Sequence, residues 1–159
     1  MPLNREEVGL DEVLRRHIFH PPMFPGGALL AVAFFEFPGG QCESVIWTRY
    51  VDGGLDGIHR LGCERQSTIR QRQQDSGKKP DKTYMGAATA HTGEISRYRN
   101  PHGHGVRVLH EPAEGRYHVH LCYDSSPGSP AMTKSDKNEI KLKLVEFFRA
   151  IERHACPGS

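Results

Sequence analysis

Two neighbouring segments that alternate apolar and polar residues place the strongest constraint on how this chain can fold. They are residues 105–111 (GVRVLHE) and 116–123 (RYHVHLCY), separated by the turn-like sequence PAEG. Alternation with a period of two is typical of a β-strand with one buried face, and a short polar turn between two such strands predicts a β-hairpin. We expect the valine-rich face of this hairpin to lie in the core.

The other face of the predicted hairpin carries the residues with the clearest potential for chemistry. With a four-residue turn, His118, His120, Cys122 and Arg107 share this face, and Arg107 lies opposite His120. Two imidazoles can act as an acid and a base, while a guanidinium can hold a phosphate through two hydrogen bonds. The pattern predicts a metal-independent phosphodiesterase or ribonuclease with His118, His120 and Arg107 as catalytic residues. The competing interpretation is a solvated strand face.

A zinc site is the other chemistry that these residue types bring to mind. His118, His120 and Cys122 are suitable zinc ligands. Three alternate residues on one strand nevertheless span about 13 Å, because each residue rises about 3.3 Å. We therefore expect neither a metal nor a cofactor.

The remaining pattern predicts two helices and a second hairpin. We expect a helix over 6–19, a strand over 28–37 paired with a strand over 43–51, and a long helix over 134–154 capped by Thr133 or Ser135. Residues 58–74 fit either a polar strand or a short helix, and 94–99 fit a short strand. The expected fold class is α+β: a single antiparallel sheet built from two hairpins, with an N-terminal helix and a long C-terminal helix packed on it. The expected core includes Phe34, Val32, Leu144, Phe147, Phe148 and Ile151.

Length and composition favour one domain. The chain has 159 residues, and we treat 1–159 as a single domain with a flexible basic loop region around 71–83 and a Ser/Gly/Pro loop at 125–130.

The longest apolar run covers 28–37, which is too short to span a membrane. The first residues show no export signal, and the four cysteines form no CxxC pair, so we expect free thiols and a cytoplasmic location.

Charge is unevenly distributed along the chain. Residues 1–57 carry four arginines and eight acids, whereas residues 58–107 carry ten basic residues and four acids. A basic segment can neutralise phosphates, and interleaved tyrosines can stack on bases. We predict a binding module that contacts nucleic acid or another anionic partner through this segment. The candidate contact residues are Arg70, Arg72, Lys78, Lys79, Lys82, Arg97 and Arg99. The alternatives are the His-dependent phosphodiesterase or ribonuclease and a non-catalytic subunit of a larger assembly, with a protein partner or a second copy of the chain.

Overall fold

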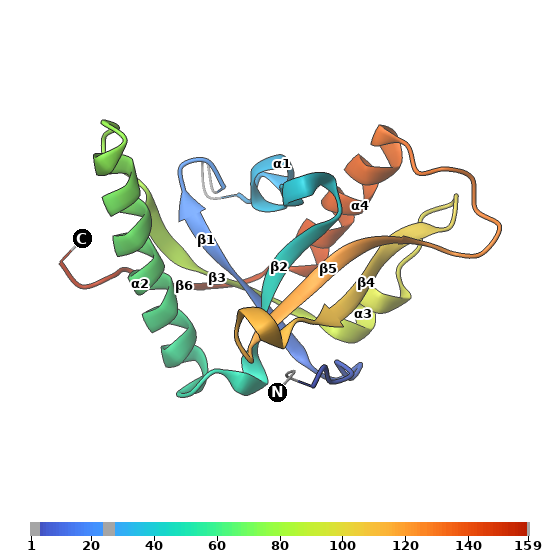
Figure 1. Ribbon diagram of the computed structural model, residues 1–159, viewed down its shortest axis with the longest axis horizontal. Helices are drawn as coiled ribbons and strands as arrows, with labels where there is room; N and C mark the ends of the chain where they lie inside the picture. The colour runs from blue at the N-terminus through green and yellow to red at the C-terminus, as the bar shows by residue number, and fades with distance from the viewer. Residues whose placement is uncertain (1–3, 24–27, 159) are drawn as a thin grey trace.

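The fold is built on one antiparallel sheet with the strand order β4-β5-β2-β1-β3-β6 (Figure 1). The computed structural model describes residues 4–23 and 28–158, apart from the side chain of Val32. Within these residues the strands are β1 (Val13–His20), β2 (Cys42–Trp47), β3 (Thr83–His91), β4 (His104–His110), β5 (His118–Ser125) and β6 (Ala150–Arg153). The α-helices are α1 (Ala31–Phe34), α2 (Gly54–Asp75), α3 (Thr92–Arg97) and α4 (Lys134–Phe147).

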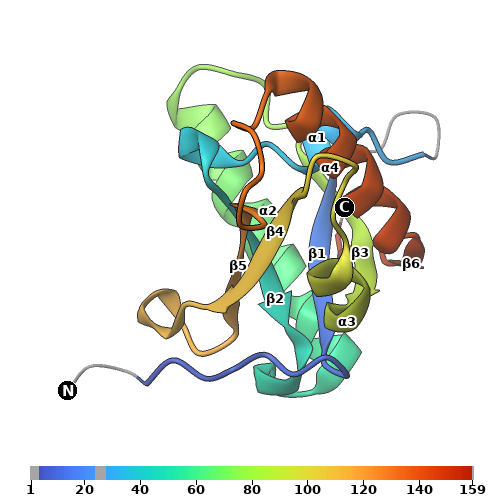
Figure 2. The same ribbon diagram turned by 90° about the vertical axis from the view of Figure 1, so that its right-hand side faces the viewer.

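Helices cover the two faces of the sheet unequally. Figure 2 shows α3 and α4 on one side of the sheet and α2 on the other. The larger apolar cluster lies under α1, α3 and α4 and includes Leu14, Val119, Leu121 and Phe148. A smaller cluster around Ile58 joins α2 to the opposite face. Because α2 packs mainly against β3, much of β2, β4 and β5 remains uncovered on that face.

The predicted N-terminal helix is wrong, because residues 13–20 form the strand β1. This strand lies inside the sheet, between β2 and β3. Leu14 and Ile18 are buried on one face, while His17 and Phe19 are buried on the other. A strand buried on both faces loses its apolar–polar alternation, so its spacing happened to fit a helix.

The predicted strand over 28–37 is also wrong, and with it the first hairpin. This segment contains the short helix α1, whose Phe34 and Phe35 pack against Phe148. The other strand of that hairpin, expected over 43–51, corresponds to β2. It pairs with β1 and β5 instead of with residues 28–37. The fold therefore contains an α+β arrangement with a single antiparallel sheet, but not the predicted helix layout.

The second predicted hairpin is confirmed, with a pairing shifted by two residues. Arg107 lies opposite Cys122, and Leu109 lies opposite His120. A shift of two residues keeps every side chain on its expected face. The valine-rich face is buried, as Val106 and Val119 show.

The C-terminal helix is shorter than predicted. Helix α4 ends at Phe147, and residues 150–153 form the edge strand β6. Thr133 caps α4 in a capping box with Asp136. Of the expected core residues, Phe34, Leu144 and Phe148 are buried, Phe147 and Ile151 are partly buried, and Val32 lies outside the described side chains.

The ambiguous segment 58–74 belongs to the 22-residue helix α2, which also includes residues 71–75 of the expected basic loop region. The helix approaches the sheet closely at Gly62, where a Cβ atom would clash with the Tyr84 ring. Its buried residues include two glycines and the polar His59 and Gln66, so it shows little apolar periodicity. Residues 92–97 form α3, where a short strand was expected.

The prediction of free thiols is wrong. The four cysteines form two disulfides, Cys42–Cys122 and Cys63–Cys156. The first joins paired residues of β2 and β5, and the second joins α2 to the C-terminal segment. Among the described residues, no helix has the length and apolar character needed to cross a membrane.

Candidate anion-binding cleft

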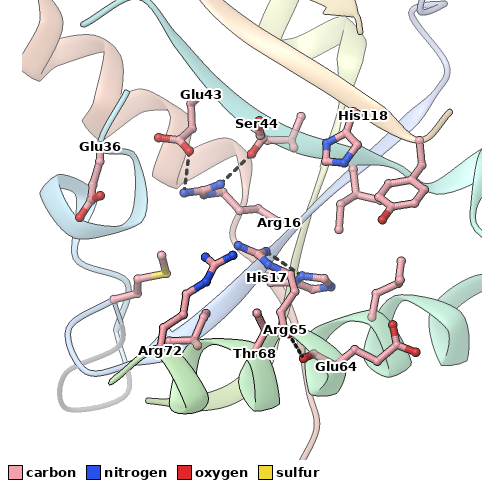
Figure 3. Close-up of a pocket in the computed structure, with 16 residues that line it drawn as sticks. Arg16, His17, Glu36, Glu43, Ser44, Glu64, Arg65, Thr68, Arg72 and His118 are labelled. Carbon is pink, nitrogen blue, oxygen red and sulfur yellow. Dashed lines mark hydrogen bonds and ion pairs between the residues drawn. The ribbon is translucent and has the colours of Figure 1, made fainter. Parts of the chain in front are cut away.

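A cleft of about 630 Å³ lies between α2 and the uncovered part of the sheet (Figure 3). Its position follows from the way β1 and β2 pair. The two strands are in register only at Leu14–Trp47 and Arg15–Ile46. Beyond these pairs the strands separate (Figure 1). Side chains from both strands and from α2 line the opening.

Arg16 occupies the opening between β1 and β2. Its guanidinium donates to the carbonyl oxygens of Phe34 and Ser44 at 2.6 and 2.7 Å and forms an ion pair with Glu43 at 2.9 Å. The second carboxylate oxygen of Glu43 accepts from the backbone N–H of Phe37. Arg16 thus satisfies backbone carbonyls that strand pairing leaves open, and Glu43 balances its charge.

Arg65 enters the cleft from α2 and is held by a histidine in place of an acid. One ring nitrogen of His17, Nε2, lies 2.8 Å from the carbonyl oxygen of Ile58, and Nδ1 lies 3.0 Å from Nη1 of Arg65. Because a guanidinium can only donate, Nδ1 accepts and Nε2 carries the proton. Burial, reinforced by the charge of Arg65, lowers the pKa of His17 to about 3. His17 is therefore neutral and orients Arg65 without cancelling its charge.

Arg72 is the third arginine of the cleft and lies two helical turns beyond Arg65 on α2. Its side chain forms no hydrogen bond or ion pair with another residue in the described parts of the chain. Figure 3 shows the guanidinium groups of Arg16, Arg65 and Arg72 pointing into the same part of the cleft. The exposed acids Glu36 and Glu64 lie at opposite ends of it. The centre of the cleft is therefore positively charged.

The predicted catalytic residues are only partly brought together. His118 and His120 project from the same face of β5, and both approach Glu114 of the turn before it. His120 Nε2 lies 3.1 Å from Glu114 Oε2, and desolvation lowers the pKa of His118. Arg107 lies opposite Cys122 instead of His120. The charged group nearest the two imidazoles is thus a carboxylate.

The predicted nucleic-acid contacts form two separate groups. Arg70, Arg72, Lys78, Lys79 and Lys82 lie at the end of α2 and in the connection to β3. Arg97 and Arg99 lie on and after α3, which is on the other side of the sheet (Figure 2). Arg70 donates to the Lys82 carbonyl oxygen and to Thr83, and Arg99 pairs with Asp124. The basic segment therefore does not form a continuous surface.

The other clustered histidines have structural partners. His104 and His110 are buried, and they lie within hydrogen-bonding distance of Ser125 and of the Arg116 carbonyl oxygen, respectively. His102 is exposed and bonds to Asp136 in the cap of α4. These contacts explain three of the ten histidines without a role in chemistry.

The residues that build the cleft were largely missed by reasoning from the sequence. Arg16 and His17 fell within the expected N-terminal helix, and Arg65 was one of many basic residues. The available signal was the run Arg15-Arg16-His17 inside an otherwise apolar segment. Charged residues in a buried segment need partners, so they mark a polar site inside the fold.

Comparison of the chain with protein-family models, with curated protein sequences and with solved structures gives no significant match. The functional argument therefore depends on the chemistry of the cleft.

Proposed function

We propose that the protein is a binding module for a small phosphate-bearing ligand, which it holds in the cleft between α2 and the sheet. The observation that carries the proposal is the pair Arg65 and Arg72. Both guanidinium groups point into the cleft, and neither has a carboxylate partner among the described residues.

The arrangement around Arg65 favours an anion over a neutral ligand. A neutral His17 fixes one side of the guanidinium, and the ring of Phe19 lies 5.1 Å from its central carbon. These contacts restrict the side chain while they leave its charge unbalanced. Arginines held in this way bind phosphate well, because they present several donors in a fixed plane.

The size of the cleft favours a small molecule. A volume of about 630 Å³ is within the usual range for small-molecule sites. Besides the arginines, the lining offers hydrogen-bonding groups on Tyr117, His118 and Glu64. A phosphate at the arginines and a polar body along the cleft would use both parts.

The test is isothermal titration of the full chain with inorganic phosphate, pyrophosphate and nucleoside phosphates. Arg65→Gln and Arg72→Gln should each weaken binding roughly 10- to 100-fold, because a charge-assisted hydrogen bond contributes about 1.5–3 kcal/mol. Arg97→Gln is the matched control, since Arg97 is an exposed helical arginine outside the cleft. It should leave the affinity unchanged.

Two outcomes would contradict the proposal. One is the absence of binding by any of these anions at low salt. The other is an equal loss of affinity in Arg65→Gln and Arg97→Gln, which would indicate a general effect of surface charge.

Nucleic acid is the competing anionic partner. Its support is the exposed pair Lys78 and Lys79, close in sequence to Arg72. A single-stranded oligonucleotide belongs in the same titration series. If it binds more tightly than the small phosphates and loses affinity in Lys78→Glu/Lys79→Glu, the ligand class is nucleic acid. Steep weakening by salt should accompany that result.

The His-dependent phosphodiesterase has less support than the binding module. Glu114 beside His118 and His120 would repel a phosphodiester, and Arg107 is not opposite either histidine. Hydrolysis of RNA or a cyclic nucleotide that is resistant to EDTA and lost in His118→Ala/His120→Ala would establish it. A role as a subunit of a larger assembly has no specific contact in its favour.

The cytoplasm is the compartment that we attach to the proposal. The Cys42–Cys122 disulfide is partly exposed, so the dithiol reductants of that compartment can reach it. Disulfides that stay oxidised are, by contrast, typical of proteins in oxidising compartments, and finding them so would count against the cytoplasm. Alkylation of the protein in intact cells decides the point: if all four cysteines are oxidised there, the cytoplasmic assignment is wrong.

A further inference from the structure

Three potential metal ligands meet on the uncovered face of the sheet, beside the cleft. The sulfur atoms of Cys42 and Cys122 and a ring nitrogen of His120 lie within 4.8 Å of one another. In the structure the two sulfurs are joined as a disulfide, with a Cα–Cα distance of 4.1 Å. All three residues are partly exposed. A reductant and an ion can therefore both reach them.

The sheet keeps the two cysteines together without help from their disulfide. Cys42 and Cys122 are directly paired residues of the antiparallel strands β2 and β5, and their ladder continues through Ile46 and His118. After reduction, backbone hydrogen bonds still hold both Cβ atoms in place. Tetrahedral zinc needs its two sulfurs only about 3.8 Å apart, given Zn–S bonds of about 2.3 Å. Side-chain rotation can supply this separation.

The surroundings of His120 complete the arrangement. Its Nε2 bonds to Glu114 Oε2 at 3.1 Å, so a neutral His120 donates from Nε2 and keeps the lone pair on Nδ1. A carboxylate that orients a ligating histidine is a common feature of zinc sites. Arg107, opposite Cys122 on β4, adds a positive charge that favours thiolate over thiol.

We propose that Cys42, Cys122 and His120 bind a zinc ion when the Cys42–Cys122 disulfide is reduced. A dithiol reductant breaks the S–S bond by exchange, leaves as its own disulfide and delivers two electrons and two protons to the cysteines. Zinc then displaces the two thiol protons and takes the His120 lone pair. Water fills the fourth position, because the site is open to solvent.

The binding test uses the full chain, reduced and desalted without oxygen. Titration with Co²⁺ should give one equivalent of binding with a thiolate-to-metal charge-transfer band, and Zn²⁺ should displace the Co²⁺. His120→Ala should weaken binding at least 10-fold, and Glu114→Gln roughly 10- to 100-fold. Oxidised protein should show no such band.

The second cysteine pair provides an internal control in the same molecule. After reduction, Zn²⁺ should protect Cys42 and Cys122 from alkylation, as measured by peptide mass spectrometry, and leave the reactivity of the partly exposed Cys63 and of the buried Cys156 unchanged. The proposal is overturned if Zn²⁺ protects Cys63 as well as it protects Cys42 and Cys122. It is also overturned if Co²⁺ gives no thiolate band, if His120→Ala binds as tightly as wild type, or if dithiols do not reduce the Cys42–Cys122 bond in the folded protein.

Discussion

Asp136 connects the start of α4 to the loop before β4 through several hydrogen bonds. Its carboxylate accepts from the backbone N–H of Thr133, from Asn100 and from His102. The first of these bonds is the main reason that the pKa of Asp136 lies below its ordinary value. The contact between His102 and Asp136, through its hydrogen bond and the charge of the carboxylate, raises the pKa of His102.

The raised pKa of His102 predicts a pH-dependent contribution to stability. The folded state binds the proton more tightly than the unfolded state. The contribution is therefore complete below about pH 6.5, the unfolded value, and is lost as the pH rises through the folded value. His102→Gln should remove it. In urea denaturation, the difference in free energy of unfolding between wild type and His102→Gln should shrink between about pH 5.5 and about pH 8.5.

A matched histidine serves as the control for this measurement. His91 is exposed at the end of β3, and its side chain has no hydrogen-bond partner in the described part of the chain. His91→Gln should track wild type at both pH values. A difference between wild type and His102→Gln that does not change with pH would show that the His102–Asp136 contact does not depend on charge.

At the level of elements, α4 is anchored by its last aromatic residues. Phe148 is fully buried against Phe34 and Phe35, whereas Phe147 is only partly buried beside Tyr98. Phe148→Ala should lower the free energy of unfolding by about 3–5 kcal/mol. Phe147→Ala should cost clearly less. Chemical denaturation of both variants measures this, and equal losses would mean that the helix packs through both rings.

The elements that sequence patterns predicted correctly are those with one buried face. The hairpin of β4 and β5 has such a face, and so does α4, which also begins with a recognisable capping box. β1 is buried on both faces, so its apolar residues carried no period of two. Around α1, the length of the apolar run over 28–37 and its Pro/Gly flanks predicted a strand, but the packing of Phe34 against Phe148 decided the structure.

The cleft was beyond prediction for a reason at the scale of the whole molecule. It brings together Arg16 of β1, Arg65 of α2 and Glu43 of β2, which are distant in sequence. Their meeting depends on where β1 and β2 separate and on which face α2 covers. The pair His118 and His120 was predicted correctly to share a face, because that property belongs to a single strand.

The position of α2 on the sheet links the stability of the fold to the proposed binding site. Helix α2 carries Arg65 and Arg72 but buries few apolar side chains. The Cys63–Cys156 disulfide ties this helix to the C-terminal segment, where Cys156 is buried against Phe19 and Tyr84. This disulfide therefore holds one wall of the cleft in place.

Removal of each disulfide should separate its effect on stability from its effect on the cleft. The two bonds span 93 and 80 residues, so Cys63→Ser/Cys156→Ser and Cys42→Ser/Cys122→Ser should each lower the free energy of unfolding by about 2–5 kcal/mol. Only the first variant frees α2, since β2 and β5 remain paired through their backbones in the second. Phosphate affinity, measured by titration well below each melting temperature, should therefore fall in the Cys63→Ser/Cys156→Ser variant and stay near wild type in the other. Equal affinities in the two variants would show that apolar packing around Ile58 and the close contact at Gly62 are sufficient to hold α2 against the sheet.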